Sequence, residues 1–381
     1  MNWNIQWMAP LFRALCMSPS ATATRALAVA VALSMPAQAA DVPPDPADAP
    51  AASAVLEAAA CTLIDTDFDI DDMMAIPLVI GNRYVAGIIT SEGYTLPQDG
   101  AAALSRLIAE PGQRPIPVII GASSHLPSEV IQKDWGQFVL DYRSMMGSAF
   151  ALLSTALPPS PPDGYNYSQE VADVVADCNS VDILVIGTFT SFINYSPAIR
   201  AKIKNVVVMG MPLRGDPTQK PGNFSFNCEY DMKACETAFN EQLPGLTYFF
   251  VGPVRTKLDT TPVGHQDTVY GPTYGMVDAL EPRGLPNALK QALVGIVRNG
   301  SLGTVVEGED YWAIDCCFKA GGKSLLWDQS AALFLVHPEA FKNVGGSGGH
   351  YEPSVSPDDF RALWTRATNA AVTYHQVPAS Q

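Results

Sequence analysis

Cys61-Thr-Leu-Ile-Asp65-Thr-Asp-Phe-Asp-Ile-Asp-Asp72 joins a short apolar run to a cluster of acidic residues. The apolar part, 61–65, has the pattern of a buried strand, and residues 71–80 have the pattern of a helix. Five carboxylates therefore fall within eight residues, where the strand ends and the helix begins. Like charges this close repel one another unless a cation neutralises them. The segment thus predicts a strand–helix unit with a cation site at its junction.

Beyond this segment, apolar strand-like runs alternate with helical stretches along the chain. Further strands are predicted at 85–90, 116–121, 181–186, 205–209 and 247–251. Further helices are predicted at 100–109, 169–177, 231–240 and 287–298. Continuous Val- and Ile-rich strands separated by helices are typical of a parallel sheet covered on both faces. We therefore expect a single α/β domain with an open, mostly parallel, doubly wound sheet that binds ligands at the carboxyl ends of its strands.

The first 39 residues have the pattern of a secretory signal peptide. Two arginines accompany an apolar run at 26–33, and Ala37-Gln-Ala39 forms a cleavage site. The run is shorter than the roughly 18 apolar residues that a membrane anchor needs, so we expect no membrane contact after cleavage. Residues 40–60, rich in Pro and Ala, are predicted to be a flexible leader, and 61–381 the folded domain. The protein is therefore expected to be periplasmic or secreted.

Composition limits the partners of the mature chain. Without residues 1–39 it would carry 21 basic and 38 acidic residues, a net charge of −17. Such a surface repels phosphate backbones, which argues against nucleic acid as a partner. The six cysteines beyond the signal lack the spacing of a zinc site. They either pair as disulfides in an oxidising compartment or remain buried thiols, and the sequence is also compatible with a homo-oligomer.

Two interpretations of the acidic cluster compete. Ligation by oxygen atoms alone favours a hard cation such as Ca²⁺ or Mg²⁺. Alternatively, Asp69, Asp71 and Asp72 cap the helix, but capping accounts for one or two acids and not for five. An EF-hand loop is excluded, because it would need Gly at its sixth position and Glu at its twelfth.

The acidic segment, extended as Asp65-Thr-Asp-Phe-Asp-Ile-Asp-Asp72-Met-Met-Ala75, resembles the N-terminal signature of the nucleoside hydrolase family. Segments similar to other motifs of that family follow in its order, and they are Ile119-Ile-Gly-Ala122, Ile186-Gly-Thr-Phe-Thr190, Val208-Met-Gly210, Gly222-Asn223, Phe226-Asn227 and Leu326-Trp-Asp328. The resemblance spans roughly residues 61–340. It implies an enzyme that hydrolyses the N-glycosidic bond of ribonucleosides, with a small-molecule nucleoside as its partner.

The resemblance also implies roles for individual residues. One Ca²⁺ would be held by Asp67, Asp72, Asp328 and the backbone carbonyl of Thr190. Asp67 would in addition be the general base that takes a proton from a metal-bound water. Negative charge nearby would stabilise the oxocarbenium-like transition state of glycoside cleavage. The ribose hydroxyls would be contacted by Asp71, Met209, Asn223 and Asn227.

The chain departs from the family pattern at several positions. Phe68 and Asp69 replace the usual Pro-Gly, so we expect either a different turn or an Asp69 that reaches the metal. Tyr94 replaces an Asn that contacts the ribose, and Ser225 replaces a Glu. These changes keep open the alternative of a non-catalytic exported protein that binds a sugar or nucleoside through Ca²⁺. A phosphatase of the haloacid dehalogenase type also starts with D-x-D, but it needs Thr or Val where Asp69 stands.

Two tryptophans bear on the nucleobase. Trp327 and Trp135 stand at positions that resemble the branch of the family preferring inosine, adenosine and guanosine, in which indoles sandwich the purine. Stacking contributes about 1–3 kcal/mol per base in nucleic-acid complexes. Either indole is equally compatible with a place in the core. We predict a preference for purine nucleosides.

Overall fold

The computed structural model describes residues 60–109, 113–123, 165–209, 226–252, 276–298, 327–345 and 350–374. The predicted signal peptide 1–39, the leader up to residue 59, Trp135 and Asn223 lie outside the described residues. Within the described part, no helix combines the length and apolar character needed to cross a membrane.

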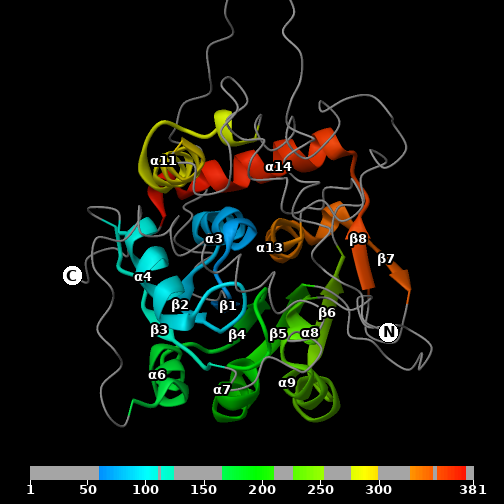
Figure 1. Cartoon of the computed structure of the whole chain (residues 1–381). Coiled ribbons are helices and arrows are strands. Elements are labelled where there is room, and N and C mark those ends of the chain that lie inside the picture. The colour runs from blue at the N-terminus through cyan, green and yellow to red at the C-terminus, as the bar shows by residue number, and fades with distance from the viewer. Residues whose placement is uncertain are drawn as a thin grey trace, which may run out of the picture. The chain divides into compact units, whose positions relative to one another are not determined.

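The described strands form one sheet with the order β3-β2-β1-β4-β5-β6-β8-β7 (Figure 1). Their bounds are β1 Cys61–Thr66, β2 Val85–Thr90, β3 Val118–Ile120, β4 Val181–Val185, β5 Ile203–Met209, β6 Thr247–Val251, β7 Phe341–Gly345 and β8 His350–Pro353. Neighbouring strands run parallel, apart from β7, which is antiparallel to β8. This confirms the expected open, mostly parallel, doubly wound sheet.

Helices cover both faces of the sheet (Figure 1). On one face lie α3 Ile70–Asn82, α4 Pro97–Leu107, α11 Gly284–Arg298, α13 Asp328–Val336 and α14 Pro357–Asn369. On the other lie α6 Tyr167–Val174, α7 Phe192–Ile199, α8 Phe226–Tyr230 and α9 Met232–Thr237. Short turns of 3₁₀ or π helix occur at Arg200–Lys202, Ala238–Gln242, Pro338–Ala340 and Ala370–Thr373.

Successive side chains along each strand point alternately into two hydrophobic cores, one on each face of the sheet. In β1, Ile64 packs with the α3 layer, whereas Leu63 packs with the α7 layer. Both side chains are completely buried, because successive residues of a strand point to opposite faces and both faces are covered. This is why the central strands read as continuous apolar runs.

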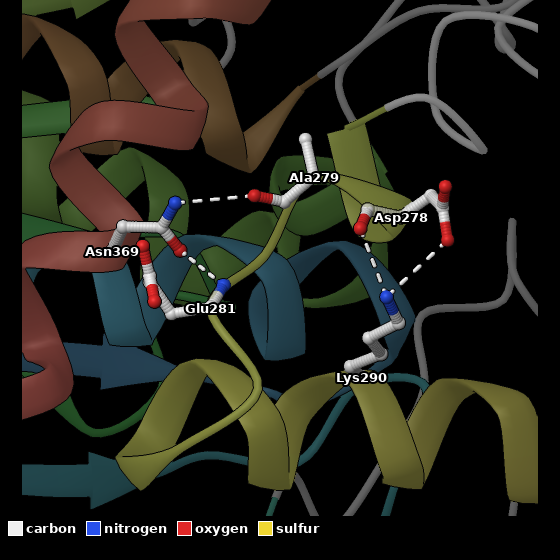
Figure 2. A network of polar contacts seen from close by, with 5 residues as sticks. All are labelled: Asp278, Ala279, Glu281, Lys290 and Asn369. Atoms are coloured by element: carbon white, nitrogen blue, oxygen red, sulfur yellow. Dashed lines mark hydrogen bonds and ion pairs between the residues drawn. The ribbon is translucent and has the colours of Figure 1, made fainter.

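The C-terminal helix α14 closes the α3 layer. The Trp364 indole N–H donates to the carbonyl of Met74 in α3 at 3.1 Å. At the end of α14, the Asn369 side chain accepts from the backbone N–H of Glu281 at 2.8 Å and donates to the carbonyl of Ala279 at 3.2 Å (Figure 2). The segment entering α11 is therefore fastened to α14, which holds the layer against α3.

Two disulfides cross-link the described chain, Cys61–Cys178 and Cys228–Cys235. The first joins the start of β1 to the residues just before β4, at the amino ends of these two strands. The second joins α8 to α9. Four of the six cysteines considered above therefore pair, and Cys316 and Cys317 lie outside the described residues.

Candidate functional site

The acidic segment lies where the strand order changes direction. From β1 the chain proceeds outward through β2 and β3, and it returns to place β4 on the other side of β1. The loops after β1 and β4 therefore diverge at the carboxyl edge, the usual ligand site of a doubly wound sheet. They also touch, because a Cβ on Gly187 would lie 2.5 Å from the backbone nitrogen of Asp67. Only glycine at 187 permits this approach.

The turn from β1 into α3 differs from the turn that a glycine at position 69 would have formed. Phe68, fully buried, is the residue with a positive φ of 41°, whereas Asp69 is extended with φ −101°. Asp69 caps α3, since its Oδ1 accepts from the backbone N–H of Asp71 at 3.0 Å. Asp72 reciprocates by accepting from the N–H of Asp69 at 3.0 Å. The capping interpretation is therefore correct for Asp69 and Asp72, alongside any role in binding a cation.

Four carboxylates converge at the start of α3. One oxygen from each lies within 4.8 Å of the others, and the residues are Asp69, Asp71, Asp72 and Asp328. Asp328 is the first residue of α13, which packs directly against α3. Its Oδ1 atom is buried without a hydrogen-bond partner in the described structure. An unpartnered buried carboxylate oxygen among other carboxylates fits a divalent cation ligated by oxygen atoms.

Electrostatics support the same conclusion. Burial, followed by the charge of Asp71, raises the pKa of Asp72 from 3.8 to about 7. Burial also raises the pKa of Asp69 and Asp328 well above the usual range, and Asp71 is the next largest cause for both. Burial, together with the mutual repulsion of the acids, makes these groups retain protons, and a bound cation would offset both effects.

Asp67 is held separately, against the loop after β2. Its Oδ2 accepts from the backbone N–H of Tyr94 at 2.8 Å, and its carbonyl accepts from the Thr95 hydroxyl at 2.6 Å. Burial, then the charge of Asp72, raises the pKa of Asp67 well above its usual value. Asp67 is thus next to the group of four without being one of its members, and its role as a metal ligand stays a prediction.

The other predicted residues are spread around the same edge. Thr190, after β4, has its carbonyl accepting from the Asn194 amide at 2.8 Å. The Asn227 amide donates to the carbonyl of Ile186 at 2.6 Å, which places α8 over the end of β4. Met209 is the last residue of β5 and is buried. Trp327 directly precedes α13 and is half-buried against the α3 core.

Sequence reasoning missed three polar residues of this region. The hydroxyl of Tyr230 donates to Oε1 of the buried Glu92 at 2.6 Å. The Thr190 hydroxyl donates to Oδ2 of Asp231 at 2.8 Å. Asp231 also caps α9, and its place at the start of the helix predicted at 231–240 was the one local signal available.

The family profile described as inosine-uridine preferring nucleoside hydrolase matches residues 62–372. The fold is similar to the inosine-uridine preferring nucleoside hydrolase from Bacillus anthracis, with 14% identity, a TM-score of 0.52, and coverage of 82% of this chain and 99% of that one. The purine-preferring ribonucleoside hydrolase from Gardnerella vaginalis is similar at 17% identity and a TM-score of 0.52, over 82% and 99%. The type III effector XopQ, complexed with adenosine diphosphate ribose, is similar at 15% and 0.52, over 82% and 93%. No curated protein matches by sequence.

Proposed function

The chain belongs to the inosine-uridine preferring nucleoside hydrolase family, and we propose that it is an exported, Ca²⁺-dependent enzyme that prefers purine ribonucleosides. Family membership makes it a ribonucleoside N-glycosyl hydrolase acting on a small-molecule nucleoside. The membership favours catalysis over the alternative of a non-catalytic binding protein. The observation that carries the finer proposal is the set of four converging carboxylates, three of them buried, at the carboxyl edge of β1 and β4.

We assign the cation to Asp72 and Asp328, with Asp67 and the carbonyl of Thr190 completing the set. Asp69 and Asp71 share the same group of oxygens and add to its charge. When bound, Ca²⁺ supplies positive charge that lowers the pKa of a neighbouring water. The donor set is all oxygen, as this ion prefers.

Asp67 is assigned as the general base. The Tyr94 N–H fixes its Oδ2 atom, and Gly93 packs so closely that a Cβ there would lie 2.1 Å from that oxygen. The carboxylate is therefore oriented before substrate arrives, and Oδ1 is left to accept a proton from the attacking water. The surrounding acids stabilise positive charge that develops on the ribose as the bond to the base breaks.

The ribose contacts are assigned to Asp71 and Asn227. Asp71 is half-buried, in contrast to the three buried members of its group, so it is the member that a ligand reaches most easily. A carboxylate can accept hydrogen bonds from two neighbouring hydroxyls. Asn227 uses its amide N–H for Ile186, which leaves its Oδ1 for a ribose hydroxyl.

The purine preference rests on Trp327. Trp327 directly precedes the proposed metal ligand Asp328 in the sequence and is half-buried, so a partly accessible indole stands at the start of α13. A purine offers more stacking area to an indole than a pyrimidine does.

Export is proposed from the N-terminal pattern and the two disulfides, since structural disulfides are typical of oxidising compartments. The full chain, expressed in a bacterium, should be recovered outside the cytoplasm with its N-terminus near residue 40. An intact N-terminus on cytoplasmic protein would contradict export.

A nucleoside panel tests the activity. Purified protein is incubated with inosine, guanosine, adenosine, uridine and cytidine, with Ca²⁺ or after complete chelation, and free ribose is measured. We expect ribose release from purine nucleosides that stops on chelation and returns with Ca²⁺. Release that persists without divalent cations would refute the metal assignment, and inactivity on every nucleoside would refute the hydrolase mechanism.

A further inference from the structure

A hairpin of two short helices, α8 and α9, lies beside the loops that carry the site, and the disulfide Cys228–Cys235 closes it. We propose that this hairpin is a positioning element, in which Asp231 and the disulfide hold Thr190 and Asn227 in their working places. The inference rests on the proposed function, because it concerns the same cation and ribose site.

Three side chains of the hairpin reach three different points at the carboxyl edge of the sheet. The Asn227 amide donates to the carbonyl of Ile186, at the end of β4, at 2.6 Å. The Tyr230 hydroxyl donates to Glu92, after β2, at 2.6 Å. Asp231 accepts from the Thr190 hydroxyl at 2.8 Å. The hairpin therefore ties together the loops after β2 and β4.

Asp231 acts with both of its carboxylate oxygens. Oδ1 accepts from the backbone N–H of Ala234 at 2.9 Å and so caps α9, while Oδ2 holds the Thr190 hydroxyl. The Thr190 carbonyl, the proposed metal ligand, accepts a hydrogen bond from the Asn194 amide at 2.8 Å. Asp231 is thus a positioning residue, since it touches Thr190 and not the proposed cation or substrate.

The disulfide determines whether Asp231 and Asn227 keep their spacing. Helices of five and six residues are too short to be stable by themselves, so their mutual position depends on tertiary contacts and cross-links. Cys228 directly follows Asn227, and the backbone N–H of Cys235 donates to the carbonyl of Asp231 at 2.9 Å. The disulfide therefore links covalently the two helices whose residues Asn227 and Asp231 make the positioning contacts.

The other disulfide is a matched control. Cys61–Cys178 joins the amino ends of the strands, opposite to the edge that carries the site. It links residues 117 apart in sequence, compared with 7 for Cys228–Cys235. A disulfide that encloses a longer loop removes more conformational entropy from the unfolded chain. Loss of Cys61–Cys178 should therefore lower Tm more than loss of Cys228–Cys235, without changing the site.

The experiment compares the double variants Cys228→Ser/Cys235→Ser and Cys61→Ser/Cys178→Ser with the parent protein. For Cys228→Ser/Cys235→Ser we expect the Ca²⁺ dissociation constant, measured by calorimetry, and KM for inosine each to rise about tenfold. The drop in Tm should be smaller than in Cys61→Ser/Cys178→Ser. The control pair should keep both constants within about twofold, with the larger drop in Tm. Equal shifts in both pairs, or parental Ca²⁺ affinity in the first, would overturn the proposal.

Two Asp231 variants separate positioning from stability. Serine retains helix capping but is too short for Thr190, so Asp231→Ser should weaken Ca²⁺ binding while Tm changes little. Asparagine keeps both the length of Asp231 and two polar atoms, so Asp231→Asn should retain the parental affinity for Ca²⁺. Equal Ca²⁺ affinity in the two variants would contradict a positioning role.

Hydrogen–deuterium exchange keeps the test independent of activity and of metal. In Cys228→Ser/Cys235→Ser, amides in 186–194 should exchange about tenfold faster than in the parent, while the control pair leaves them unchanged. Unchanged exchange in the first variant overturns the hairpin proposal even if the protein hydrolyses nucleosides. Faster exchange in an inactive protein supports the hairpin proposal, although the proposed function would then have failed.

Discussion

Removing divalent cations should make the protein progressively less stable as pH rises from about 5 to about 8. The buried acids cause this dependence. Burial raises the pKa of Asp65 to about 7, offset in part by the Ser91 hydroxyl, and burial with the charge of Asp71 raises that of Asp72 to about 7. In the unfolded chain both return to about 3.8. The folded state therefore binds more protons between these values, so the contribution of these two groups to stability is fully present below about pH 4 and is lost as pH rises through 7.

The magnitude follows from the size of the shift. For Asp65 the change from 3.8 to about 7 is roughly three pH units, and each unit corresponds to about 1.4 kcal/mol. That single carboxyl accounts for about 4 kcal/mol, a large part of the 5–15 kcal/mol by which ordinary domains are stable. Asp67, Asp69 and Asp328 shift in the same direction. A cation bound among Asp72 and Asp328 takes the place of their protons, so Ca²⁺ should flatten the part of the pH dependence that comes from the cluster, whereas the part from Asp65, outside the group of four, should remain.

Urea unfolding at several pH values, with chelator or with Ca²⁺, measures this directly. Asp328→Asn removes one charge at nearly constant size, so it should make the chelated slope shallower and reduce the stabilisation by Ca²⁺. Asp177→Asn, at an exposed acid away from the cluster, is the matched control and should reproduce the parent. A chelated protein equally stable at pH 5 and pH 8, with no gain from Ca²⁺ at pH 8, would refute the reasoning.

Asp67→Asn should lower kcat for inosine by about 10²–10⁴ with Ca²⁺ bound, because the amide cannot accept the proton, and a parental rate would show that Asp67 is not the base. Trp327→Ala should reduce kcat/KM for inosine about tenfold and for uridine less, since stacking favours the larger base, and a parent that prefers uridine would contradict the purine assignment. Gly187→Ala should cost about 1–3 kcal/mol and most of the activity, because its Cβ would lie 2.5 Å from the Asp67 nitrogen. Gly87→Ala, whose Cβ meets the Val174 side chain at 3.2 Å, is the milder control for urea unfolding and activity.

The central strands were predictable because they are largely buried on both faces and are dominated by apolar residues. The edge pair β7 and β8 was missed, since Phe341–Gly345 and His350–Pro353 contain too few apolar residues to show a strand pattern. Helix α13 was missed for the opposite reason. Nearly all its residues are buried, so Asp328–Val336 lacks the apolar stripe by which a helix is recognised.

For the site, local sequence was enough to predict that acids gather where the first strand enters its helix, because residues so close in sequence must also be close in space. Only the tertiary structure brought Asp328 to them, through the packing of α13 on α3. It alone moved the positive φ from residue 69 to Phe68 and gave Asp69 its capping role. It also selected Asp231 as the partner of Thr190. Contacts between distant segments depend on strand order and layer packing, and the local spacing of residues along the sequence determines neither.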